Sequence, residues 1–184
     1  MTLKYIKNLL AATIIVAISS IHIQADATYP PKVKVIDAIA IVESDRNPYE
    51  IGDKNLINKA YGIYQIRKPV TNEYNAAHHT HYRPEDCLGN VELSKKICGW
   101  YDDHWVKYWQ KHLKRQMTVS EKVRIWNGGP TGWKKKSTVQ YAAKVYAARD
   151  ILIEEKLRKE RLERVRLEIA QQDAANNAPA LTER

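Results

Sequence analysis

The residue with the clearest chemical potential is Glu43, which lies at the end of an apolar helical face. Ile36 and Ile39 precede it by seven and four residues, so the three side chains share one side of a helix expected over 33–43. Burial on such a face raises the pKa of a carboxyl group, which then stays partly protonated near neutral pH. A protonated carboxyl beside a cleft can donate its proton to the leaving oxygen of a glycosidic bond. The pattern alone supports equally an alternative in which Glu43 turns to solvent where the helix frays.

Helices surround this candidate acid along the chain. Asn47-Pro48 ends the first of them, because proline disfavours helical geometry in the residue before it. The polar connector 49–60 can hold a small hairpin with Gly52-Asp53 as one turn, and an apolar segment follows over 63–66. The pattern therefore predicts a mainly α fold with at most a small β-hairpin. Its later helical or apolar segments are 91–114, 119–126 and 139–153.

The C-terminal part of the chain is rich in charge. Residues 149–184 hold eight basic and eight acidic side chains, so the whole formal net charge of +9 belongs to residues 1–148. Oppositely charged residues four positions apart can stabilise an isolated helix by about 0.2–0.5 kcal/mol per pair. The sequence predicts a charged helix over 149–170 and a disordered tail over 171–184. One interpretation is that the helix is simply solvated. The alternative is that residues 154–169 contact a protein partner through a short coiled coil, which the lack of a sustained heptad pattern disfavours.

The N-terminus has the features of an export signal. Lys4 and Lys7 precede an apolar stretch over 9–23, and Ala25-Asp26-Ala27 supplies the small residues that a signal peptidase reads. The stretch is short for a membrane-spanning helix, which needs about 20 mainly apolar residues. We therefore expect residues 1–27 to be a signal peptide, and the mature chain to be periplasmic or secreted and to have no transmembrane helix.

Export makes the two cysteines informative, because an oxidising compartment permits disulfides. Cys87 and Cys98 are the only cysteines of the chain, and we expect them to be bridged. A ring of this size would stabilise the fold by roughly 2–3 kcal/mol. The alternative is a pair of buried free thiols.

The basic excess favours a polyanionic partner such as nucleic acid, anionic lipid or an acidic cell-wall polymer. Residues 134–136 are three lysines beside Trp133, but no nucleic-acid motif accompanies them and export disfavours this partner. His78, His79 and His81 cluster in one loop and match no familiar zinc pattern, so no metal is expected. The sequence has neither a phosphate-binding glycine loop nor a recognisable nucleophilic triad, and we expect no cofactor.

Four short motifs follow one another along the chain. They are Glu43-Ser44, Ala60–Ile66, Ile125–Gly129 and Gln140–Val145. Together they resemble the signature of lytic transglycosylases of the lysozyme-like superfamily. That signature comprises a catalytic Glu-Ser, a Gly-(Leu/Ile)-x-Gln-(Ile/Leu) motif, an Ala-Tyr-Asn motif and a final Tyr-x-x-x-Val helix. The resemblance implies a lysozyme-like helical domain over 30–148 that cuts peptidoglycan glycan strands.

The resemblance also implies roles for single residues. Glu43 would protonate the glycosidic oxygen between N-acetylmuramic acid and N-acetylglucosamine, and the backbone at Gly62 would pass close to the sugar. Trp126 replaces the family's usual Tyr, which removes a hydrogen-bonding hydroxyl, and Tyr64 replaces Met or Trp. Both keep an aromatic face on which a sugar could stack. The positions that match substrate-binding residues of the family are Ser44, Gly62, Tyr64, Gln65, Trp126, Asn127 and Tyr141.

The type of product depends on a second carboxylate. Hydrolysing glycosidases place one roughly 5–9.5 Å from the acid, and Asp53 in the connector could take that role beside Glu43. The resemblance implies the other outcome, because lytic transglycosylases use the substrate's own N-acetyl group and C6 hydroxyl and form a 1,6-anhydro ring. Gly52-Asp53 is also ordinary turn chemistry, so transglycosylation is preferred over hydrolysis. A further alternative is a non-catalytic lysozyme-like module that binds glycan or serves as a structural part of an envelope machine.

Overall fold

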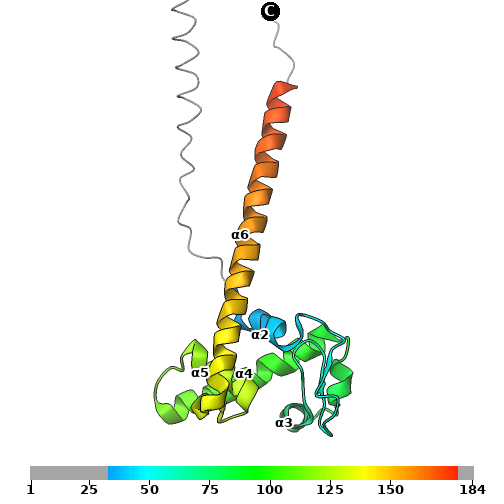
Figure 1. Ribbon diagram of the computed structural model, residues 1–184, viewed down its shortest axis with the longest axis vertical. Helices are drawn as coiled ribbons and strands as arrows, with labels where there is room; N and C mark the ends of the chain where they lie inside the picture. The colour runs from blue at the N-terminus through cyan, green and yellow to red at the C-terminus, as the bar shows by residue number, and fades with distance from the viewer. Residues whose placement is uncertain (1–32, 178–184) are drawn as a thin grey trace, which may run out of the picture. The chain divides into compact units, whose positions relative to one another are not determined.

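The structure, a computed structural model, describes residues 33–177 (Figure 1). These residues form a mainly α-helical fold with one small two-stranded antiparallel hairpin, as the sequence predicts. The signal peptide expected over 1–27 lies outside the described residues. The helices are α2 (Val35–Ser44), α3 (Lys68–His78), α4 (Val91–Leu113), α5 (Val119–Gly128) and α6 (Val139–Asn176), and the strands are β1 (Ile51–Gly52) and β2 (Ala60–Tyr61).

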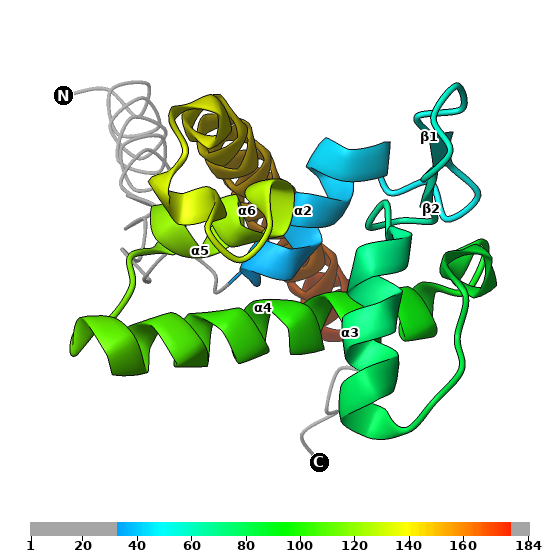
Figure 2. The same ribbon diagram turned by 90° about the horizontal axis from the view of Figure 1, so that it is seen from below.

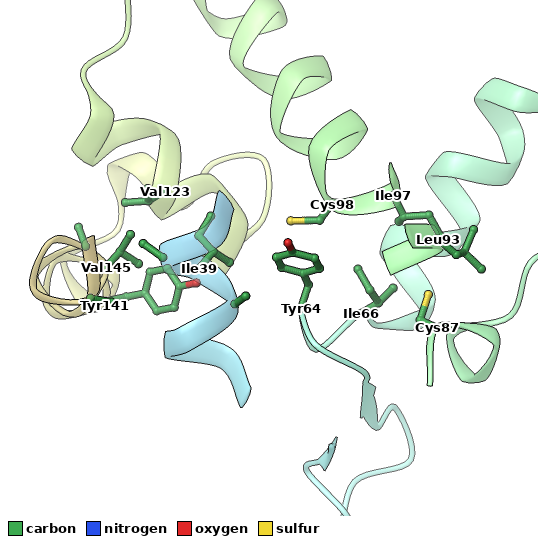
Figure 3. Packing of buried hydrophobic residues seen from close by; sticks show 14 of the residues in the cluster. Ile39, Tyr64, Ile66, Cys87, Leu93, Ile97, Cys98, Val123, Tyr141 and Val145 are labelled. Atoms are coloured by element: carbon green, nitrogen blue, oxygen red, sulfur yellow. The ribbon is translucent and has the colours of Figure 1, made fainter. Parts of the chain in front are cut away.

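The hydrophobic core forms around α2. Three consecutive residues of this helix, 38–40, are buried, and Ile39 packs toward Val123 of α5 and Val145 of α6 (Figure 3). In Figure 2, α2 lies between α5 and α6 on one side and the hairpin and α3 on the other. The carboxyl end of α2, which carries Glu43, is therefore placed between these two sides of the fold.

Helix α3 is not predicted by the sequence pattern, in which Pro69 restricts the apolar segment before it. Pro69 is instead close to the start of α3, where a helix does not need the backbone N–H that proline lacks. The helix is polar and buries only Thr71 and Tyr74, so its apolar stripe is too narrow to show a clear period. Arg67 is the N-cap residue of α3, so its place after the turn that follows the hairpin is set by the start of this helix.

The disulfide expected between Cys87 and Cys98 is wrong, because both residues are buried free thiols. The Ser94 hydroxyl donates to the backbone oxygen of Cys87 at 3.0 Å, which places Cys87 beside Ser94. Cys98 lies one turn further along α4, about 6 Å along the helix axis. Figure 3 shows its sulfur beside Tyr64, whereas the sulfur of Cys87 lies near Leu93. Burial raises the pKa of Cys87 to about 11 and that of Cys98 well above 9.0, so both thiols stay protonated.

Helix α6 runs without a break from Val139 to Asn176. The charged helix expected over 149–170 is the continuation of the helix that packs on α2, and α6 runs past position 171, where the disordered tail was expected to start. From residue 158 onward the described side chains of α6 are exposed. Within residues 33–177, no helix is both long enough and apolar enough to span a membrane.

A buried carboxyl group on α4 makes the stability of the fold depend on pH. Among the described residues, Oδ1 of Asp102 is buried and has no hydrogen-bond partner. Burial raises its pKa from 3.8 to about 6, with a further rise from Asp103 and an opposing effect of Lys122. Between these two values the folded protein keeps a proton that the unfolded chain releases, so stability falls as the pH rises through this range.

We therefore predict that Asp102→Asn raises the melting temperature near neutral pH. The variant lacks the charge that is costly to bury, and below pH 3.8 its melting temperature should match that of the wild type. Thermal unfolding followed by circular dichroism at both pH values measures the difference. An equal gain at both values would contradict the predicted cause.

Candidate active site

A cleft of about 350 Å³ contains Glu43 and lies between the hairpin and the end of α5. It brings together five of the residues expected at the site, namely Glu43, Asp53, Gln65, Trp126 and Asn127. A sixth, Tyr141, reaches the Glu43 carboxyl from α6. The remaining lining residues are Gly52, Arg67, Pro69, Val70, Tyr101 and Gly129.

Helix α2 ends immediately after Glu43 and Ser44. Asp45 and Arg46 adopt left-handed backbone conformations with φ of 51° and 63°, which stops the helix. The Ser44 hydroxyl donates to the backbone oxygen of Ile63 at 2.9 Å and so ties the end of α2 to the turn after the hairpin. Ser44 is not among the residues that line the cleft, and its hydroxyl is bonded to the backbone, so the substrate contact expected of it stays a prediction.

Two hydrogen-bond donors hold the Glu43 carboxyl group. The Tyr141 hydroxyl donates to Oε1 at 2.7 Å, and the Trp126 indole N–H donates to the same oxygen at 3.1 Å. Burial raises the pKa of Glu43 above its ordinary 4.5 and outweighs these two hydrogen bonds and the charge of Arg67, all of which lower it. Because Oε1 accepts both hydrogen bonds, the proton of the neutral acid belongs on Oε2.

The indole of Trp126 makes a contact that the resemblance does not indicate. The resemblance implies that Trp126 lacks the hydrogen-bonding hydroxyl of the family's Tyr, yet the indole N–H supplies a hydrogen bond to Glu43. Tyr101 of α4 packs edge-on against the indole, with ring centroids 5.8 Å apart and an interplanar angle of 87°. This contact fixes the plane in which the indole donor points.

Gln65 closes the turn that joins the hairpin to α3. Its backbone is left-handed, with φ of 51°, and its side-chain amide donates to the backbone oxygens of Glu50 at 3.2 Å and Gly62 at 3.0 Å. A Cβ at Gly52 would overlap Oε1 of Gln65, so a larger residue there would displace the Gln65 side chain. The amide donors of Gln65 are thus committed to the backbone, and the residue shapes the wall of the cleft.

Tyr64 and Gly62 lie in the core, so the substrate contacts expected of them are wrong. Tyr64 is 2% exposed and packs beside Ile66 and Cys98, which leaves neither face of its ring open to a sugar (Figure 3). Gly62 is buried with φ of 74°, and a Cβ there would overlap the backbone oxygen of Cys87. Both residues support the turn that carries Gln65.

Arg67 is a cleft residue that the motifs do not indicate. Its guanidinium forms an ion pair with the Asp53 carboxylate and donates through Nη1 to the backbone oxygen of Asn58 at 2.8 Å. Asp53 therefore lines the cleft as expected, but its carboxylate is engaged by a cation. Tyr101 was also missed, because it is buried among the apolar residues of α4 and resembles an ordinary core residue.

The histidine and lysine clusters of the sequence have other contacts. His78 stacks on Tyr74 with ring centroids 4.3 Å apart, and Lys134 Nζ lies 4.6 Å from the ring centroid of Trp109. Within the part of the chain that the structure describes, no group of three or more His, Cys, Asp or Glu side chains is arranged to hold a metal ion.

Comparisons with known proteins do not assign the chain to a family. No protein-family model and no curated protein matches it. The chain is similar to one chain of the crystal structure of Aeromonas hydrophila PliI in complex with Meretrix lusoria lysozyme, with 18% sequence identity and a TM-score of 0.48. The alignment covers 60% of this chain and 84% of that chain. A similarity of this size indicates neither a shared family nor a shared function.

Proposed function

We propose that the chain is an exported lytic transglycosylase with a lysozyme-like fold. It cuts the β-1,4 bond between N-acetylmuramic acid and N-acetylglucosamine in peptidoglycan. The observation that carries the proposal is the state of the Glu43 carboxyl group, which lies in a cleft, has a raised pKa and is oriented by two donors on one oxygen. A solvated surface glutamate has none of these properties, so they support a catalytic acid.

In the proposed reaction Glu43 acts first as an acid and then as a base. Its Oε2–H protonates O4 of N-acetylglucosamine while the bond from that oxygen to C1 of N-acetylmuramic acid breaks. The N-acetyl oxygen of the substrate stabilises the positive charge at C1. The C6 hydroxyl oxygen of the same sugar then bonds to C1, and its proton passes to the Glu43 carboxylate. The acid is restored, no water is consumed, and the product carries a 1,6-anhydro end.

The ion pair between Asp53 and Arg67 favours this reaction over hydrolysis. In a two-carboxylate hydrolase the second carboxylate attacks C1 or takes a proton from the attacking water. A guanidinium engages the Asp53 carboxylate in this cleft. Hydrolysis by Glu43 with Asp53 is the competing enzymatic function, and a non-catalytic module that binds glycan is the competing function of another class.

The proposal also covers location and partners. The chain would act in the periplasm or outside the cell, with peptidoglycan glycan strands as its substrate. The basic excess of residues 1–148 suits the anionic cell wall. The exposed part of α6 is a proposed contact for a protein partner.

The pH dependence of cleavage follows from the raised pKa of Glu43. Only the protonated acid can start the reaction, so the rate should fall as the pH rises through this pKa, at values above 4.5. Tyr141→Phe removes a donor that stabilises the carboxylate, so it should shift this fall to higher pH. Initial rates measured against pH for both proteins test the prediction. A fall centred at or below 4.5 in the wild type would refute it.

Two measurements on purified peptidoglycan test the proposed function. Loss of turbidity shows whether the chain is a catalyst, and the masses of the released muropeptides show which reaction occurs. Transglycosylation predicts N-acetylmuramic acid ends that are one water lighter than hydrolysed ends. Hydrated ends alone would assign hydrolysis instead, whereas binding to peptidoglycan without loss of turbidity would assign the non-catalytic module.

A further inference from the structure

Arg67, a cation that lines the cleft, contacts the loop between β1 and β2, and its position at the start of α3 determines these contacts. Arg67 is the N-cap of α3, and its backbone follows Ile66, which pairs with Tyr61 of β2. From this fixed position the guanidinium reaches two points of the loop between β1 and β2. One nitrogen pairs with the Asp53 carboxylate and the other donates to the backbone oxygen of Asn58 at 2.8 Å.

The partner of this cation, Asp53, has a position suited to a second catalytic carboxylate. It follows β1 directly, has a left-handed φ of 50° and lines the same cleft as Glu43. Both side chains of the ion pair are about two-fifths exposed, and such pairs add little to stability, about 0–1 kcal/mol. The pair also restricts the carboxylate, because Nη2 of Arg67 donates to Oδ2 of Asp53, occupies a lone pair of that oxygen and holds the carboxyl group in one orientation.

We propose that Arg67 is a positioning residue that sets the product of the reaction, because it holds the Asp53 carboxylate away from the water that would otherwise attack C1. The inference rests on the proposed function and adds the reason why this cleft would form anhydro ends. With the pair intact, the C6 hydroxyl is the nucleophile and its proton returns to Glu43.

Without Arg67, Asp53 becomes available as a general base. Glu43 still gives its proton to the leaving O4 of N-acetylglucosamine as the C1–O4 bond breaks. Water oxygen then bonds to C1 and its proton passes to the Asp53 carboxylate, so the product is a hydrated end. Atoms and charge balance with one water consumed, and no further reactant is needed.

The test compares four proteins on purified peptidoglycan: the wild type, Arg67→Met, Asp53→Asn and the double variant. The ratio of hydrated to anhydro ends is measured by mass spectrometry. We expect Arg67→Met to raise this ratio at least about tenfold, because a general base contributes about 10²–10⁴-fold where it acts freely. Asp53→Asn also breaks the ion pair, yet it removes the base and should yield anhydro ends. The double variant should do the same.

This set separates the role of Arg67 in product choice from a merely structural role in holding the loop. If loss of the pair only loosened the loop, Arg67→Met and Asp53→Asn would give the same ratio, and that result would overturn the inference. Arg67→Lys, which keeps the charge and loses the two-point contact, should give an intermediate ratio and serves as the second variant if Arg67→Met does not fold. A wild type that releases no muropeptides would overturn the proposed function itself, whereas anhydro ends alone from active Arg67 variants would overturn this inference only.

Discussion

Glu43→Gln is expected to reduce the rate of peptidoglycan cleavage by about 10²–10⁴-fold while the protein stays folded. Glutamine has the same shape, and its amide oxygen can still accept the hydrogen bonds from Tyr141 and Trp126. The amide has no acidic proton to give to the leaving oxygen. Turbidity loss of purified peptidoglycan measures the effect.

The same substitution is expected to raise the melting temperature near neutral pH. The folded protein holds Glu43 protonated at pH values above 4.5, where the unfolded chain releases the proton, so stability falls as the pH rises through this range. A neutral glutamine removes that cost. Loss of activity together with a gain in stability is the behaviour of a functional group that is costly to bury, and it cannot be explained by misfolding.

Glu73→Gln is the matched control for Glu43→Gln. Glu73 also accepts a hydrogen bond from an indole, that of Trp105 at 2.9 Å, but it does not line the cleft. Its substitution should leave cleavage within a few-fold of the wild type. Equal losses in both variants would remove Glu43 from its assigned role.

Gly62→Ala is expected to destabilise the fold by about 2–4 kcal/mol, which lowers the melting temperature by roughly 5–15 °C for a chain of this length. Two effects add at this position. The backbone has φ of 74°, which is strained for alanine, and the new Cβ would overlap the backbone oxygen of Cys87. Because Gly62 also accepts both the backbone and side-chain hydrogen bonds of Gln65, the wall of the cleft should shift as well.

Gly89→Ala separates the two effects at Gly62. Gly89 has nearly the same φ, 73°, but its Cβ would meet the ring of Tyr49 at 2.7 Å. Tyr49 is 70% exposed, so its ring can move aside. The variant should be destabilised only by the strained backbone conformation, which lowers the free energy of unfolding by about 1–2 kcal/mol. Denaturant titrations measure this loss. Equal losses of unfolding free energy in the two variants would show that the overlap with Cys87 does not contribute to the destabilisation of Gly62→Ala.

The elements that carry Glu43 could be predicted from the sequence because their signals are local. The apolar residues of α2 recur with the helical period, and Asn47-Pro48 marks where the chain leaves the helix. The hairpin follows from the polar connector, although Gly52, expected in the turn, lies in β1 and the turn is formed by the residues after it. These patterns lie within short stretches of the sequence, and they are enough to indicate a mainly α fold with a small hairpin.

The surroundings of Glu43 could be predicted only in part, because its partners are distant in the sequence. Trp126 and Tyr141 lie 83 and 98 residues away, and motif order indicated them without showing that both reach the same oxygen. Arg67 belongs to no motif, and its contact with Asp53 depends on where α3 begins.

The expectation of a disulfide failed for a related reason. Cysteine count and an expected export signal indicate that a bridge is possible, but the geometry of α4 decides whether the two sulfurs meet. The bond from Ser94 places Cys87 one helical turn away from Cys98. Tyr64 and Gly62 were likewise assigned to the substrate by position in a motif, although burial gives them a role in the core.

The mass of the N-acetylmuramic acid ends released from purified peptidoglycan is the most direct test of the proposed activity. The proposed mechanism predicts ends one water lighter than hydrolysed ends from the wild type, and none from Glu43→Gln. Hydrated ends alone from the wild type, or anhydro ends in equal amount from Glu43→Gln, would contradict it.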